Sequence, residues 1–262
     1  MSETLQSQLN DKGVLTITMN RPEVHNAFDN EQIVRMITAL ETAESSPEVR
    51  VVIIASEGKS FSAGGDINYM KQMGNNSYQE NLDDAAQLAK LMKTLNFLAK
   101  PTIAKVQGAA MGGGVGLVSC CDFAIGTKRT KMALSEVKLG MAPATIAPYV
   151  VRTIGERAAR RLFISAQTIN AQRAFELGFL SEVVAEEELD AAVDQLANSL
   201  LNNAPHGMQL AKQAAHRVAS GVIDEDLISY TTKLIADIRD SDEGKEGLSA
   251  FLEKRSPNWI EE

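Results

Sequence analysis

The sequence predicts an α/β fold in which parallel strands alternate with helices. The stretch "VVIIA" at Val51–Ala55 is a continuous apolar run, which is typical of a parallel strand buried on both faces. Helices are predicted on either side of it, over Glu31–Ala43 and Glu80–Leu98. The 262 residues, with 44% hydrophobic and 23% charged side chains, suffice for one large domain or for a domain with an appendage.

The predicted elements follow one another regularly along the chain. An alternating strand at Gly13–Met19 and a loop at Asn20–Asn30 precede the first helix, for which Asp29 or Asn30 is the expected N-cap. After the second helix come a strand at Pro101–Gly108, a helix opened by glycines and running to about Cys121, short strands in "DFAIGT" and "KMALS", and helices from Ala147 onward, interrupted by "FLSEVV". This alternation predicts right-handed βαβ units.

Charge and cysteine usage exclude several classes of protein. The net charge of −8 disfavours binding to nucleic acids or anionic membranes, and no apolar run reaches membrane-spanning length. The polar, acidic start "MSETLQSQLNDKG" resembles neither a signal nor a transit peptide. Cys120 and Cys121 are adjacent, which makes them poor disulfide partners, and they match no metal-ligand spacing. We therefore expect a cytoplasmic protein with two core cysteines and no metal site.

Two glycine-bearing loops each follow a predicted strand and precede a helix. They are "GKSFSAGGDI" at Gly58–Ile67 and "GAAMGGGVGL" at Gly108–Leu117. Glycines leave backbone N–H groups uncovered, and a helix N-terminus adds a positive dipole end that suits a phosphate or an oxyanion. A dinucleotide fingerprint starting at Gly112 fails, because Leu117 stands where its third glycine belongs. The alternative for each loop is a plain strand-to-helix turn.

Glu136 is the one carboxylate in the mostly apolar segment "LSEVKLGMAPA". A carboxyl group in an apolar pocket has its pKa raised toward neutrality, as general acid–base catalysis requires. The segment therefore makes Glu136 a candidate acid–base residue. The alternative is a solvent-facing glutamate at a strand end.

Five segments in this order resemble the crotonase, or enoyl-CoA hydratase/isomerase, superfamily. They are "NRPEVHNAF", "FSAGGDI", "QGAAMGGGVGLVSCCDFAI", "SEVKLGMAP" and "FLEKRSPNW", and together they cover essentially the whole chain. The resemblance implies a crotonase-like spiral of ββα units over residues 1–195 and a C-terminal helical trimerisation region over 196–262. It also implies a homotrimer or homohexamer that acts on acyl-CoA thioesters. Coenzyme A then enters as part of the substrate, and no separate cofactor is expected.

The resemblance also assigns site residues. The backbone N–H groups of Gly65 and Gly113 match an oxyanion hole, and Glu136 matches a catalytic glutamate. Phe251 and Lys254 match a terminal pair that reaches the nucleotide of CoA from a neighbouring subunit, although Lys254 also fits an ordinary solvated lysine, as Asp66 fits a structural residue. The positions expected to contact the substrate or CoA are Val24, Ala27, Ala63, Gly64, Asp66, Ile67, Gly112, Gly116, Pro143, Phe251 and Lys254.

The sequence departs from the typical hydratase at one position. Such enzymes carry a first glutamate where this chain has Gly116, and they carry glycines where it has "PATIAP". We expect the missing side chain to leave a gap that holds water or substrate. A single Glu136 suits an isomerase, which moves one proton between two carbons. It also suits a hydratase, if one water serves both steps or another donor or a substrate carboxylate takes part.

Two of these segments favour the hydratase. "GGGVGLVSCCDFAI" together with "LSEVKLGMAPATIAPYVVR" looks similar to bacterial methylglutaconyl-CoA and carboxygeranoyl-CoA hydratases, which serve leucine and terpene breakdown. The sequence thus predicts an enoyl-CoA hydratase for a branched or carboxylated substrate such as 3-methylglutaconyl-CoA. The alternatives are an enoyl-CoA isomerase and a non-catalytic acyl-CoA-binding homologue.

Overall fold

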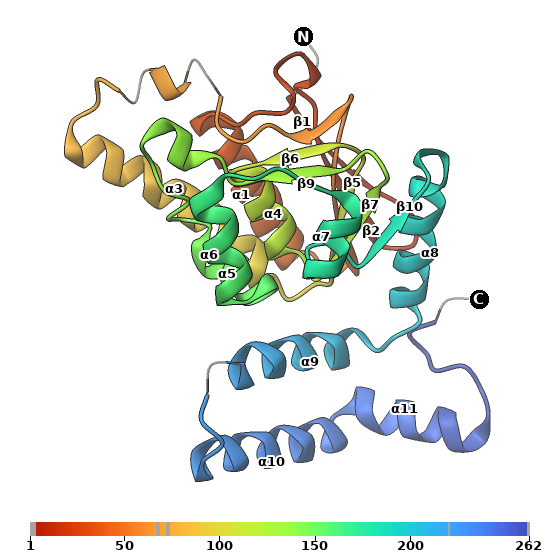
Figure 1. Cartoon of the computed structure of the whole chain (residues 1–262). Coiled ribbons are helices and arrows are strands. Elements are labelled where there is room, and N and C mark those ends of the chain that lie inside the picture. Colours follow the sequence, from red (N-terminus) through yellow and green to blue (C-terminus); the bar gives the residue numbers. More distant parts are fainter. Residues whose placement is uncertain (1–3, 67–68, 72–73, 220, 261–262) are drawn as a thin grey trace.

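The computed structural model describes residues 4–66, 69–71, 74–219 and 221–260 (Figure 1). The described residues form two sheets. The larger sheet has the strand order β1-β2-β3-β5-β7-β10, formed by Leu5–Leu9, Val14–Met19, Val51–Ser56, Thr102–Val106, Phe123–Thr127 and Glu182–Val184. The smaller sheet has the order β4-β6-β8-β9, formed by Ser60–Ser62, Ala109–Met111, Lys131–Ala133 and Ile169–Asn170.

The two sheets repeat one unit along the chain. Strands β2, β3, β5, β7 and β10 are parallel, and each of β3, β5 and β7 is followed directly by a short strand, β4, β6 or β8, of the smaller sheet. A helical segment then leads to the next strand pair. This β-β-helix repeat is the predicted spiral of ββα units. The sequence does not predict strand β1, because its residues "LQSQL" are mostly polar and exposed. This strand pairs with β2 in antiparallel register and covers its edge.

The helices agree with the predicted order. Asp29 accepts a hydrogen bond from the Gln32 N–H at 2.9 Å and is the N-cap of α1. Ser77 and Glu80 form a capping box at the start of α3. The helices are α1 (Asn30–Ser45), α3 (Tyr78–Asn96), α4 (Gly113–Cys120), α5 (Ala147–Ile154), α6 (Glu156–Ser165), α7 (Ala171–Leu177), α8 (Leu189–Leu201), α9 (Pro205–Val218), α10 (Glu225–Asp240) and α11 (Asp242–Glu253). Among the residues described, no helix is long and apolar enough to cross a membrane.

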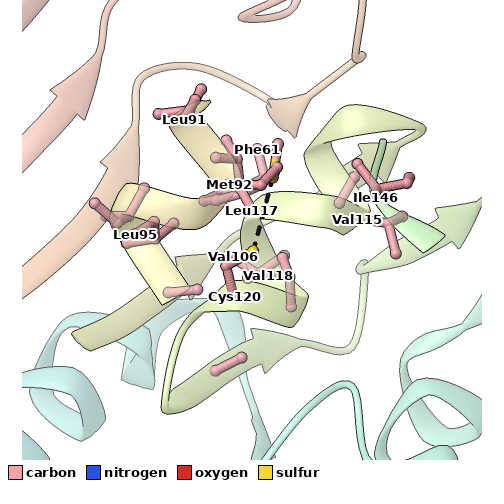
Figure 2. Close-up of a cluster of buried hydrophobic side chains, with 14 of the residues drawn as sticks. Phe61, Leu91, Met92, Leu95, Val106, Val115, Leu117, Val118, Cys120 and Ile146 are labelled. Carbon is pink, nitrogen blue, oxygen red and sulfur yellow. Dashed lines mark hydrogen bonds between the residues drawn. The ribbon is translucent and has the colours of Figure 1, made fainter. Parts of the chain in front are cut away.

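The main core lies between the sheets and helices α1, α3 and α4. Figure 2 shows part of it, with side chains of α4 such as Leu117 and Val115 between Met92 of α3 and the segment that carries Ile146. A second cluster joins the other face of the large sheet to α8, through residues such as Ile53, Ile125 and Val193. Because β3 contributes to both clusters, it is buried on both faces, as its continuous apolar run predicts.

The last three helices extend away from this body (Figure 1). Within the described part of α9–α11, Leu227 and Ala250 are the only buried apolar residues. The chain returns to the body through Trp259, whose indole N–H donates to the Asn202 carbonyl at 3.2 Å. The proposed boundary between residues 195 and 196 lies inside α8, which packs as one helix on the second core cluster.

Candidate active site

The two glycine loops meet at one place in the structure. Gly64 has a φ of +85°, and a Cβ there would stand 2.8 Å from the Met111 carbonyl oxygen and 3.5 Å from the Gly113 nitrogen. Only a glycine allows this approach, because any side chain would collide with the neighbouring backbone. The N–H groups of Gly65 and Gly113 have no acceptor among the described residues. Two free donors therefore stand beside one close backbone contact.

Phe28 connects the two loops. Its N–H donates to the Gly64 carbonyl at 2.8 Å, and its carbonyl accepts from the Asp66 N–H at 3.0 Å, so it pairs with the backbone on both sides of Gly65. Its ring lies against Gly113, where a Cβ would stand 2.7 Å from Cε2. One residue thus fixes the position of both loops.

Arg21 holds the first of these loops from the other side. Its guanidinium contacts the Asp29 carboxylate at 2.8 Å, the Asp66 carboxylate at 3.1 Å and the Ala27 carbonyl at 3.0 Å. Asp66 is 6% exposed, so this ion pair gives it a structural role, and its contact with CoA stays a prediction. Buried Asn26 adds hydrogen bonds to the carbonyls of Glu57 and Ser60.

Sequence reasoning missed Arg21, Asn26 and Phe28 as positioning residues. All three lie in the segment "NRPEVHNAF", which was singled out as a whole. The available signal was an arginine and an asparagine in a loop that also contains buried apolar residues, since buried polar groups need partners. Nothing in the sequence identifies those partners.

Glu136 stands next to the second loop. It follows β8 and begins a short 3-10 helix, η2 (Glu136–Leu139). Gly112, with a φ of +50°, donates its N–H to the Ala133 carbonyl, and a Cβ on Gly112 would stand 3.1 Å from Oε1 of Glu136. The other carboxylate oxygen, Oε2, is buried and has no hydrogen-bond partner among the described residues. Burial raises the pKa of Glu136, as expected for an acid–base residue.

The apolar neighbours of Glu136 do not form its pocket. Val137, Leu139 and Met141 are 39%, 61% and 48% exposed. The carboxyl group is therefore shielded by the glycine loop beneath it, while the side chains that flank it in sequence face outward. The apolar composition of the segment predicts a desolvated carboxyl group, and the structure has one. The desolvation comes from the glycine loop and not from the apolar neighbours in sequence.

The prediction of an open gap at Gly116 is wrong. A Cβ at this position would stand 2.4 Å from Cγ2 of Ile146 and 3.1 Å from the Met92 sulfur. The space is filled by these two side chains, which Figure 2 shows on either side of α4. Gly116 therefore permits close packing of α4, and the segment "PATIAP" supplies the isoleucine that occupies the site of the missing side chain.

The remaining predicted contacts lie in different parts of the chain. Ala63 donates its N–H to the His25 carbonyl at 2.9 Å, so the loops that carry Val24, Ala27 and Ala63 lie together. Pro143 is buried in the segment after Glu136. Ile67 lies outside the described residues. Phe251 and Lys254 lie at the exposed end of α11, away from the glycine loops (Figure 1), so the structure does not bring them to this site.

The arrangement joins two unused N–H donors to a desolvated carboxyl group, and comparison with known proteins identifies its family. Residues 10–262 match the enoyl-CoA hydratase/isomerase family. The chain belongs to this family. A crystal structure of an enoyl-CoA hydratase from Shewanella pealeana is 44% identical, with a TM-score of 0.95, and the match covers 98% of this chain and 96% of that one.

Two curated relatives carry more specific names. Crotonyl-CoA hydratase of Syntrophomonas wolfei is 33% identical over 252 residues, which are 95% of each chain. The 2,3-dehydroadipyl-CoA hydratase of Escherichia coli is 30% identical over 260 residues, which are 99% of each chain. Both matches span the body and the C-terminal helices of this family member.

Proposed function

We propose that this protein catalyses the reversible addition of water to an enoyl-CoA thioester. The observation that carries the proposal is the desolvated carboxyl of Glu136 beside the free N–H groups of Gly65 and Gly113. Family membership and the names of the relatives support the same reaction class.

The two donors would form the oxyanion hole. During hydration, the water oxygen bonds to C3 of the substrate and the C2=C3 electrons move into the thioester, which becomes an enolate. The negative charge gathers on the thioester oxygen, where Gly65 and Gly113 can donate and where the N-terminus of α4 adds its dipole. A preorganised donor of this kind lowers the barrier by about 3–4 kcal/mol.

Glu136 would transfer the proton at C2. Its carboxyl lies next to Gly112, so a thioester oxygen in the hole would place the adjacent C2 close to it. The raised pKa keeps a larger fraction of the carboxyl protonated near neutral pH, which suits delivery of a proton to the enolate.

The substrate we propose is branched or carboxylated, such as 3-methylglutaconyl-CoA. The exposed apolar side chains of Val137, Leu139 and Met141 offer a surface for a branched acyl chain. The E. coli relative is named for a dicarboxylic acyl group. The comparison of kcat/KM for crotonyl-CoA and 3-methylglutaconyl-CoA tests this assignment, and preference for crotonyl-CoA would contradict it.

An isomerase is the second candidate, because one carboxyl group suffices to move a proton between C2 and C4. Absorbance at the conjugated thioester band separates the possibilities. Hydration of a 2-enoyl-CoA removes the band, isomerisation of a 3-enoyl-CoA creates it, and a non-catalytic acyl-CoA-binding protein changes neither. We expect the first result.

We also propose that the protein assembles as a homotrimer or homohexamer. Helices α10 and α11 expose large apolar side chains, among them Ile235 at 44%, Leu248 at 62% and Phe251 at 79%. Burial of these side chains against a second copy would stabilise the assembly. It would also bring Phe251 and Lys254 of one chain to the site of another. Light scattering should give a mass of three or six chains.

A further inference from the structure

A second carboxyl group shares the unusual environment of Glu136. Oδ1 of Asp84, on α3, is buried without a hydrogen-bond partner, and burial raises the pKa of this side chain. Within the described residues, Asp84 and Glu136 are the only acidic side chains that combine a buried, unpartnered oxygen with a raised pKa. Asp84 as a whole is half-buried, so one carboxylate oxygen is shielded from water while the residue keeps its contact with solvent.

Asp84 lies on the inner face of α3. Leu88, Leu91 and Leu95 follow it at intervals of four, three and four residues, which places all four side chains on one stripe of the helix. Leu91 and Leu95 are fully buried in the main core, and Leu88 packs against it. The carboxyl group of Asp84 therefore continues a core-facing stripe beyond the point where the apolar residues end.

The topology places this end of the stripe on the same side of the fold as the glycine loops. Helices α3 and α4 each return the chain to the start of the next parallel strand, β5 and β7, so the two helices run in the same direction. Met92 of α3 contacts the position of Gly116 in α4. Asp84 lies about 12 Å before Met92, and Gly113 lies about 4.5 Å before Gly116, at a helical rise of about 1.5 Å per residue. Measured along the common direction of the two helices, Asp84 thus lies beyond the first turn of α4, toward the end of α4 where Gly112 and Glu136 lie.

Hydration requires two proton transfers at different atoms. One proton leaves the attacking water at C3, and one arrives at C2. The run from Gly112 to Gly116 carries no side chain that can exchange a proton, and Glu136 lies beside the thioester end of the site. A second group farther from the oxyanion donors would take the proton of the attacking water directly, so that Glu136 would not have to serve both steps.

We propose that Asp84 is this second acid–base group, an inference that rests on the proposed hydratase function. The Asp84 carboxylate takes a proton from water as the water oxygen bonds to C3. The C2=C3 electron pair moves to the thioester oxygen, and the enolate then takes a proton at C2 from the Glu136 carboxyl. Proton exchange with solvent restores both groups. Asp84 therefore acts at C3 and Glu136 at C2.

The neighbouring Asp83 supplies a matched control. It is exposed and accepts a hydrogen bond from the Gln79 amide at 2.8 Å on the outer side of α3. With crotonyl-CoA as substrate, Asp84→Asn should lower kcat at least about 100-fold. Asp83→Asn should stay within about twofold of the wild type. Asp84→Asn should also unfold at no lower temperature than the wild type, because the amide removes a desolvated charge.

A half-reaction separates a chemical role from a structural one. Exchange of the C2 hydrogens of butyryl-CoA in deuterated water needs the oxyanion donors and Glu136, but no attack at C3. Asp84→Asn should retain this exchange while hydration is lost, and Glu136→Gln should lose both. Loss of exchange in Asp84→Asn, or normal hydration by it, would overturn the inference. A wild type that hydrates no enoyl-CoA would overturn the proposed function and this inference with it.

Discussion

The spiral body buries its large apolar side chains, whereas the C-terminal helices expose many of theirs. The body surrounds Met92, Leu95 and Leu117 completely, whereas α11 exposes Phe251 and Leu252 at 79% and 70%. Both candidate acid–base groups and both candidate N–H donors belong to the body. The two predicted CoA contacts that the structure leaves far from the site lie in α11 and at its C-cap. We infer that variants in the body change kcat, and that variants in the C-terminal helices change KM and assembly.

The largest effect is expected from Glu136→Gln. Loss of the acid–base carboxyl should lower kcat at least about 100-fold, while acyl-CoA binding survives because the amide keeps the shape of the side chain. Steady-state kinetics and a direct binding measurement with butyryl-CoA check both parts. Near-normal turnover would show that Glu136 takes no part in the reaction. It would also contradict the inference that the body carries the residues that set kcat.

The same variant makes a prediction about pH. Burial raises the pKa of Glu136 in the folded chain, so the folded state keeps this proton at pH values where the unfolded chain, with a pKa of about 4.3, has lost it. This group therefore destabilises the fold progressively as pH rises from the unfolded toward the folded pKa. The difference in Tm between Glu136→Gln and the wild type should therefore be more positive at pH 8 than at pH 4. Equal differences in Tm at both pH values would show that the carboxyl is not desolvated.

Substitution of Gly116 should act through stability. Gly116→Ala pushes a methyl group into Ile146 and should destabilise the protein by about 1–3 kcal/mol. The double variant with Ile146→Ala, which removes the colliding Cγ2, should recover part of this loss in denaturant unfolding. For Gly116→Glu, we expect activity toward crotonyl-CoA and a branched enoyl-CoA to fall by the same factor. A loss of activity toward only one of the two substrates would indicate that the space beside Gly116 does hold substrate.

Phe28 tests how the body aligns its two donors. Phe28→Ala removes the ring that lies against Gly113 but keeps the backbone bonds to the Gly64 loop. The donors then lose part of their alignment, and kcat should fall about tenfold with little change in KM. Phe28→Leu should restore much of the activity because it refills the space. An equal loss of kcat in both variants would point to a need for the aromatic ring itself.

The smallest effects are expected in the C-terminal helices. Lys254→Ala should raise KM for acyl-CoA about two- to fivefold with kcat unchanged, which corresponds to the roughly 0.5–1 kcal/mol of an exposed charge contact. Phe251→Ala should do the same and weaken the assembly measured by light scattering. Lys233→Ala, an exposed lysine on α10, is the control. A change in kcat instead of KM would contradict the inference that the C-terminal helices affect only substrate binding and assembly.

The sequence alone determined the order of the elements and the chemistry of the candidate site. Hydrophobic patterns are local, so the strand at Val51–Ala55 and an N-cap at Asp29 or Asn30 could be predicted from their own residues. Glycine and glutamate are likewise informative by type, since few positions tolerate a run of glycines or a carboxyl among apolar neighbours. These signals pointed to the glycine loop and to Glu136, and the family resemblance then singled out Gly65 and Gly113 as the donors.

Only the tertiary structure decided what meets at the site. Phe28 and Gly113 are far apart in the chain, as are Ile146 and Gly116, and their contacts arise from the stacking of separate β-β-helix units. Asp66 is paired because Arg21 comes from another loop, and Oδ1 of Asp84 is buried on α3, which packs on α1 and α4. Burial and partners depend on the positions of distant residues, so the pKa of a carboxyl and the space beside a glycine cannot be calculated from local sequence. For this reason, Gly116 could be predicted as an open gap and yet be filled by Ile146.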